Sequence, residues 1–101
     1  MTVAPNVLMS LVTIALREVP GVVRPGIAPR GRSGHRGDGV ALRLEGDGVC
    51  ADCYLIAQAD TNLLELGMTA QATVAAVIQE LAGMSVREVN IYIQDVEAGN
   101  G

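Results

Sequence analysis

The residues of this chain that could do chemistry are two cysteines, one histidine and a group of arginines. Cys50 and Cys53 form a C-x-x-C motif, a pattern that elsewhere serves redox chemistry or metal binding. Redox pairs of this kind usually begin a helix, whereas both cysteines here lie inside an alternating strand pattern. A spacing of three places them on opposite faces of a strand, so they cannot share one metal ion. We therefore expect no metal site, and we interpret Cys53 as a small core residue.

His35 is the only histidine of the chain. Histidine can act as a general acid or base when a second group orients its ring. The sequence around His35 offers no such group, so we interpret it as a solvated side chain. With no recognisable catalytic constellation, the chain is predicted to be non-enzymatic, with no catalytic residue and no cofactor.

The stretch from residue 30 to residue 37 is rich in arginine and glycine and allows two interpretations. Arginine side chains and glycine backbone amides can bind the phosphates of lipid head groups or nucleic acid, which makes Arg30, Arg32 and Arg36 candidate anion-binding residues. The alternative, which we favour, is a solvated loop between two strands. The stretch is not a P-loop, because it lacks Gly-Lys-Ser/Thr and the chain contains no lysine.

Composition narrows the class of protein. The chain has 101 residues and a net charge of −4, and an acidic chain is poorly suited to binding nucleic acid. Its length indicates one domain, which we expect over residues 1–97 with a flexible tail at 98–101. No segment reaches the ~20 apolar residues of a membrane span. The apolar stretch at residues 7–16 lacks the flanks of a signal peptide. We predict a cytoplasmic protein with reduced thiols.

The periodicity of apolar residues predicts two helices and four strands. Apolar residues at helical spacing follow Pro5 and continue to Val19, and a second helix is expected from Asn62 to Gly83, with Thr61 or Asn62 as its cap. The expected strands cover residues 21–24, 40–45, 49–58 and 86–96. The order α-β-β-β-α-β predicts an α+β fold in which two helices pack on one face of a small mixed or antiparallel sheet.

The face of the sheet that the helices leave uncovered is the most plausible contact surface. Alternation predicts that Tyr54, Ile56, Tyr92 and Gln94 lie there, and we take these four as candidate protein-interaction residues. The alternative is that the two tyrosines only stabilise the sheet by cross-strand packing. The second helix is unusually poor in charge between Met68 and Ala76, which suggests that it is covered on more than one side, for example by another subunit.

Four segments carry a resemblance to a known family. Residues 17–22 (REVPGV), the hairpin from Gly39 to Leu55, residues 62–65 (NLLE) and residues 84–96 (MSVREVNIYIQDV) are similar, in this order, to the alkaline shock protein family of bacterial envelope stress response proteins. In the last segment a Val-Asn-Val/Ile-x-Val/Ile-Gln-x-Val pattern is characteristic of that family. The resemblance extends over roughly residues 4–96.

The resemblance implies a non-enzymatic, cytoplasmic stress protein that acts by protein contacts. Some members of the family self-assemble, and some are recruited to the membrane by a membrane-anchored partner protein. The expected partners are therefore another protein, a second copy of the chain, or both. The family provides no catalytic residues to transfer. The alternative hypothesis is a module that binds nucleic acid or anionic lipid through the arginine-rich loop at residues 30–37.

Overall fold

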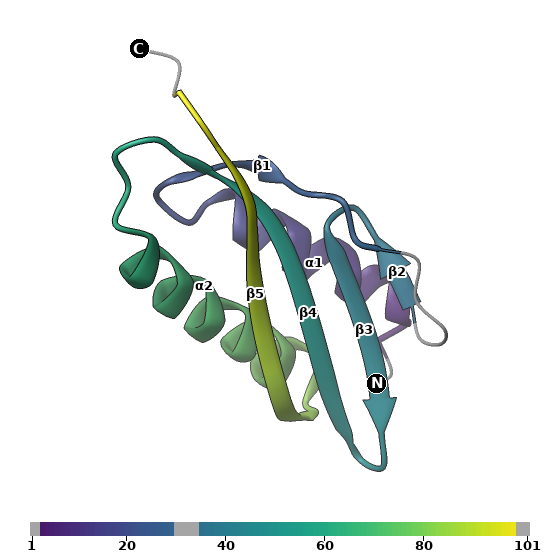
Figure 1. The fold of residues 1–101 in the computed structure, drawn as a ribbon. Coiled ribbons are helices and arrows are strands. Elements are labelled where there is room, and N and C mark those ends of the chain that lie inside the picture. Colours follow the sequence, from purple (N-terminus) through teal and green to yellow (C-terminus); the bar gives the residue numbers. More distant parts are fainter. Residues whose placement is uncertain (1–2, 30–34, 99–101) are drawn as a thin grey trace.

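The computed structural model describes residues 3–29 and 35–98 of the chain, and it shows an α+β fold in which two helices lie behind one sheet (Figure 1). The elements, in chain order, are α1 (Pro5–Arg17), β1 (Val22–Pro25), β2 (His35–Gly37), β3 (Val40–Glu45), β4 (Gly48–Gln58), α2 (Leu63–Val77), the π-helical turn η1 (Ile78–Ala82) and β5 (Ser85–Glu97). The predicted fold class is confirmed, and the structure adds the short strand β2 within the stretch predicted to be a loop.

Strand β4 is the centre of a five-stranded mixed sheet. On one edge it pairs antiparallel with β3 along its first half and with β1 near its end, and on the other edge it pairs parallel with β5. Strand β2 extends the sheet beyond β3. A parallel pair needs a long crossover connection, and α2 with η1 provides it between β4 and β5.

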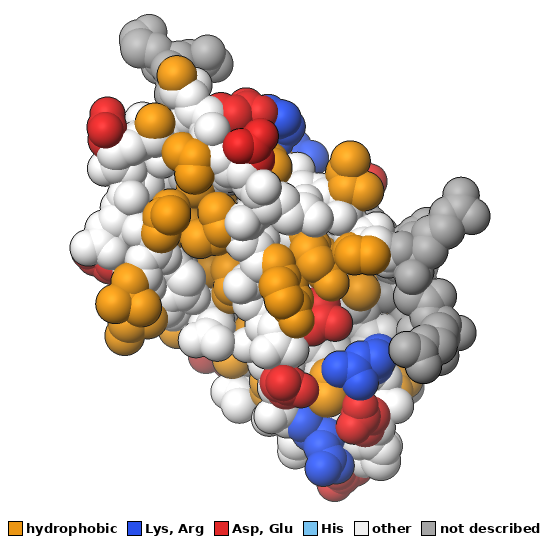
Figure 2. Space-filling view, viewed as in Figure 1, with side chains coloured by type: hydrophobic (Ala, Val, Ile, Leu, Met, Phe, Trp, Pro, Cys, Tyr) orange, Lys and Arg blue, Asp and Glu red, His pale blue; other side chains and the backbone are white. Residues whose placement is uncertain are grey.

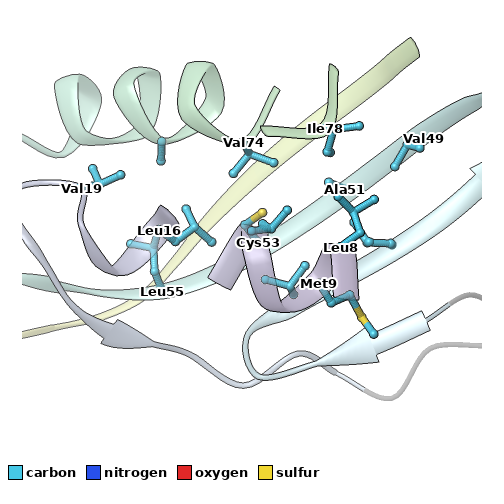
Figure 3. Packing of buried hydrophobic residues seen from close by; sticks show 14 of the residues in the cluster. Leu8, Met9, Leu16, Val19, Val49, Ala51, Cys53, Leu55, Val74 and Ile78 are labelled. Atoms are coloured by element: carbon cyan, nitrogen blue, oxygen red, sulfur yellow. The ribbon is translucent and has the colours of Figure 1, made fainter. Parts of the chain in front are cut away.

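The two helices cover the same face of the sheet, as predicted. Alternate residues of β4 point toward them, and Val49, Ala51, Cys53, Leu55 and Ala57 are all fully buried. Figure 3 shows Val49, Ala51, Cys53 and Leu55 meeting residues of both helices. The helix residues at the centre of this cluster are Leu8, Val12, Leu16, Leu66, Ala70, Val74 and Ile78.

Local signals explain where the helices begin and end. Pro5 occupies the first turn of α1, where a missing N–H costs little, and α1 ends at Arg17. The Asn62 side chain caps α2 by accepting a hydrogen bond from the Glu65 N–H at 3.0 Å, which confirms the predicted cap. Gly83 adopts a left-handed conformation and ends η1. Among the described residues, no helix combines the length and the apolar character needed to cross a membrane.

Gly39 marks the point where β1 and β3 meet beside β4. The Tyr54 N–H donates to the Gly39 carbonyl, and the Gly26 N–H donates to the Tyr54 carbonyl, both at 2.7 Å. Gly39 has a positive φ of 68°, and a Cβ atom there would lie 2.8 Å from the Tyr54 carbonyl oxygen. Only glycine fits at this junction, which positions Tyr54 in the middle of the uncovered face.

Candidate functional site

The uncovered face of the sheet, hereafter the open face, is built from pairs of side chains on neighbouring strands. The register of β4 and β5 pairs Asp52 with Asn90 and Tyr54 with Tyr92. Figure 2 views this face and shows hydrophobic side chains at its centre, with charged groups toward its ends. Parallel strands in register therefore bring together residues that lie 38 positions apart in the chain.

The two tyrosines form a stacked pair at the centre of the open face. Their ring centroids are 4.8 Å apart and their planes are inclined by 13°. Tyr92 is 45% exposed, and burial raises the pKa of the Tyr54 hydroxyl, with smaller contributions from Asp52 and Tyr92. The prediction that the two tyrosines lie on one face is confirmed by this contact, which also provides the cross-strand packing that we considered as the alternative.

Polar side chains around the tyrosines are bound to one another. Asn90 Nδ2 donates to Asp52 Oδ1 at 2.9 Å, below the stacked pair in the direction of the β3–β4 turn. At the opposite end, the guanidinium of Arg24 on β1 makes a two-pronged ion pair with the Glu97 carboxylate on β5. This pair lowers the pKa of Glu97, chiefly through the hydrogen bond from Arg24. A partner that covers the tyrosines would therefore bury few polar groups that lack a hydrogen-bond partner.

Gln94 performs a structural task that the sequence did not indicate. Its side-chain oxygen accepts a hydrogen bond from the Ile27 N–H, and its nitrogen donates to the Ile27 carbonyl, both at 2.8 Å. This contact fixes the segment after β1 against β5. It leaves the Ile27 side chain 81% exposed beside the open face. Ile27 belongs to no periodic pattern, and only the preceding Pro25-Gly26 marked this position as a turn.

Ile56 lies on the open face but is only 7% exposed. The register places Arg24 of β1 on one side of it and Asp95 of β5 on the other. Of the four predicted interaction residues, Tyr92 is thus the most accessible apolar one. Ile56 lies beneath its neighbours, and the amide of Gln94 is engaged by Ile27.

The predicted anion site falls largely on residues that the structure does not describe. Arg30 and Arg32 lie outside the described residues. Arg36 and His35 contribute backbone to β2, which pairs with β3 through His35–Leu42, Arg36–Ala41 and Gly37–Val40. The positions of their side chains are not described, so the anion-binding role of these residues stays a prediction.

The cysteines lie on opposite faces of β4. Cys53 is fully buried in the core between the sheet and the helices, where burial raises the pKa of its thiol to about 12. Cys50 points toward the open face, and burial raises its pKa as well. Thiols held protonated in this way are poor nucleophiles and poor metal ligands. Among the described residues, no group of three potential ligands is close enough to hold a metal ion.

The outer side of α2 is a second apolar surface. Leu64 and Met68 are 76% and 63% exposed, and they line a shallow depression of about 470 Å³ together with Ala72. Nothing charged occurs from Met68 to Gln79. The lack of charge between Met68 and Ala76 is evident from the sequence, and in the structure the exposed apolar residues Leu64 and Met68 lie on the side of α2 that faces away from the core.

Comparison with known proteins gives one family. The model of the alkaline shock protein 23 family, a family with a cell envelope-related function, matches residues 1–98. The uncharacterised Bacillus subtilis (strain 168) protein YqhY is 25% identical over 101 residues, which cover 94% of this chain and 75% of YqhY. A second uncharacterised protein of that strain, YloU, is 34% identical over 62 residues. That alignment covers 61% of this chain and about half (52%) of YloU.

Solved structures with the same fold include forms of the MamM CTD. The form spanning residues 215–293 has a TM-score of 0.63 and is 18% identical, and the alignment covers 93% of this chain and 98% of that one. The copper form has a TM-score of 0.65 and is 17% identical, with 95% of this chain and 90% of that one covered. At this level of identity the likeness concerns the fold alone.

Proposed function

Because this chain belongs to the alkaline shock protein 23 family, whose function is related to the cell envelope, we propose that it acts by binding other proteins and has no catalytic role. The contact surface is the open face, centred on Tyr54 and Tyr92. The observation that carries this proposal is the stacked tyrosine pair, in which Tyr54 is half-buried and Tyr92 is exposed, and whose polar neighbours are already bound to one another.

The energetics of the open face support this proposal. Tyrosine offers a large contact area with few rotatable bonds, so it loses little conformational entropy when a partner covers it. The rings of Tyr54 and Tyr92 fix each other by stacking, which reduces that loss further. Ile27 adds an exposed aliphatic side chain whose backbone Gln94 holds in place. Aromatic and aliphatic groups of this kind typically contribute most of the binding energy in protein interfaces.

The partner is a protein or a second copy of the chain, and the family's relation to the envelope points to a partner anchored in the membrane. Recruitment by such a partner would bring the chain to the membrane periphery. Binding of nucleic acid or anionic lipid by the loop at residues 30–37 stays the alternative, and its dependence on salt separates the two hypotheses.

A pull-down from the native host tests the proposal. The tagged wild-type chain is compared with Tyr92→Ala, which removes the exposed ring, and Tyr92→Phe, which keeps the stacking surface. Ile14→Ala serves as the matched control, since Ile14 is 57% exposed on α1, away from the open face. We expect the wild type, Tyr92→Phe and Ile14→Ala to capture the same proteins, and Tyr92→Ala to capture none of them. The proposal is wrong if Tyr92→Ala, folded as judged by circular dichroism, captures the same proteins in the same amounts as the wild type.

A further inference from the structure

Strand β5 has one edge without a strand partner among the described residues. It runs for 13 residues, from Ser85 to Glu97, and pairs only with β4. One of its backbone groups shows which residues face the free edge. The Val89 carbonyl accepts a hydrogen bond from Gln71 Nε2 at 2.9 Å, so the backbone groups of Val89 point away from β4.

The alternation of a strand extends this observation to its neighbours. The N–H and C=O of one residue point to the same side, and successive residues point to opposite sides. Val89, Ile91 and Ile93 therefore all direct their backbone groups toward the free edge. An edge of this length is a ready template for another strand.

The apolar residues of β5 are placed symmetrically about Ile91. Val89 and Ile93 lie two residues from Ile91 on either side, and Val86 and Val96 lie five residues from it. All five face the helix-covered side of the sheet, since the register pairs them with the core residues of β4. Even the two irregularities of β5, next to Arg87 and next to Gln94, lie on either side of Ile91. An antiparallel copy centred on Ile91 would thus place apolar residues opposite apolar residues.

Two of the four charged residues of β5 follow the same symmetry. Arg87 and Asp95 each lie four residues from Ile91, so an antiparallel copy would bring each Arg87 opposite Asp95 of the other strand. Both residues lie on the open face, Arg87 over Gly48 and Asp95 beside Ile56. Among the described residues, neither takes part in an ion pair. Within one chain they are about 26 Å apart, since a strand rises about 3.3 Å per residue.

The helix beside this edge would lie next to its own copy in such a pair. Helix α2 packs against β5, and the hydrogen bond from Gln71 to Val89 places the middle of the helix next to the middle of the strand. Figure 1 shows α2 lying beyond β5, on the side away from β4. From Met68 to Gln79 the helix carries no charge, so there would be no charge repulsion between the two copies of this segment.

We propose that two copies of this chain join along β5, antiparallel about a two-fold axis at Ile91, to form one continuous sheet. This inference rests on the proposed function, because it names a second copy as one of the protein partners, and it uses a different surface from the tyrosine pair. Ile91 exchanges two backbone hydrogen bonds with its own copy, and Val89 does the same with Ile93 of the other strand. The Val89 carbonyl keeps its bond to Gln71, since a carbonyl oxygen has two lone pairs.

Charge reversal tests the pairing and its register. Light scattering after size-exclusion chromatography should give twice the 10.5 kDa of one chain for the wild type. In the two-fold pair residue 87 of each chain lies opposite residue 95 of the other, so either Arg87→Glu or Asp95→Arg creates two contacts between like charges. Each variant alone should therefore have the mass of one chain. An equimolar mixture of the two should recover the doubled mass, because each reversed residue then meets its complement. Arg17→Glu and Glu18→Arg make the same changes of charge on and beside α1, and should leave the doubled mass unchanged.

Hydrogen exchange gives an independent readout. Raising the protein concentration should slow exchange of the Ile91 and Ile93 amides in the wild type, and should leave them unaffected in Arg87→Glu. The proposal is overturned if the wild type stays a single chain up to about 1 mM, a concentration at which even a weak dimer forms. It is also overturned if the single reversals stay dimeric or if the mixture fails to associate. None of these results would change the capture of partners by the open face, which depends on Tyr92.

Discussion

Gln94 on β5 binds both backbone groups of Ile27, with two hydrogen bonds of 2.8 Å. The two residues are 67 positions apart in the chain, and the contact fastens the segment after β1 to the far side of β4. It explains why Gln94 lies at the rim of the open face without being free for a partner. The contact holds the backbone of Ile27 and leaves its side chain in solvent, where it is the most exposed large apolar group among the described residues.

Replacing Gln94 by alanine should release this segment. The variant loses two partly exposed hydrogen bonds, and we expect a loss of about 1–2 kcal/mol in the free energy of unfolding. Urea unfolding measures it, with Gln79→Ala as the control, since Gln79 is an exposed glutamine without a side-chain hydrogen bond among the described residues. Equal stability of the two variants would show that the contact does not stabilise the fold.

Two glycines with nearly the same φ should respond differently to alanine. Gly39 and Gly83 have φ values of 68° and 65°, so alanine brings a backbone penalty of about 1–2 kcal/mol at each. At Gly83 no atom lies within 4 Å of the added Cβ, whereas at Gly39 it meets the Tyr54 carbonyl at 2.8 Å and Pro25 at 2.9 Å. Gly39→Ala should therefore cost about 1–3 kcal/mol more than Gly83→Ala in chemical denaturation. Equal losses of stability would mean that the backbone at the β1–β3 junction shifts readily to accommodate the added Cβ atom.

Stability should fall at alkaline pH because of Cys53. The folded thiol has a pKa of about 12, raised by burial from the ordinary value of 9.0. As the pH rises, the thiol therefore loses its proton in the unfolded chain before it does so in the folded chain. The stability that the protonated Cys53 contributes is fully present below pH 9 and is lost between pH 9 and pH 12. The slope is about 1.4 kcal/mol per pH unit. Urea unfolding between pH 9.5 and pH 11 should show a shallower decline in Cys53→Ala, and identical slopes would contradict the assignment.

The arginine-rich loop gives a prediction that decides between the two functional hypotheses. If residues 30–37 bind phosphates, affinity for vesicles of anionic lipid or for DNA must fall steeply as salt increases. Replacing Arg30, Arg32 and Arg36 by serine should then abolish binding at low salt, where Arg17→Ser should not. We expect the wild type to bind neither ligand at low ionic strength. Tight binding that depends on salt and on these arginines would favour the alternative.

Much of the fold could be predicted from local patterns. Strict alternation in β4 identified Cys53 and Leu55 as core residues, and the cap at Asn62 fixed the start of α2. These predictions succeeded because strand alternation and helix capping depend on residues close together in the chain. Alternation also predicted that Tyr54 and Tyr92 share the open face, whereas their stacking depends on the register of β4 and β5.

Features that depend on distant contacts could not be predicted. The role of Gln94 requires Ile27, and nothing near Gln94 in the chain indicates that contact. Strand β2 is short and lies in an arginine- and glycine-rich stretch, so its pairing with β3 is set by the tertiary structure rather than by its own composition. The burial of Ile56 likewise depends on Arg24 and Asp95, which reach it from two other strands.

Site-specific photo-crosslinking in the native host tests the central claim most directly. Benzoylphenylalanine replaces Ile27 beside the open face in one variant, and in the control it replaces Ile14, which is also exposed but lies on α1. We predict that the probe at position 27 crosslinks to discrete proteins, that the probe at position 14 does not, and that adding Tyr92→Ala removes the crosslinks. Crosslinks from position 27 that match those from position 14, or that persist with Tyr92→Ala, would contradict the account.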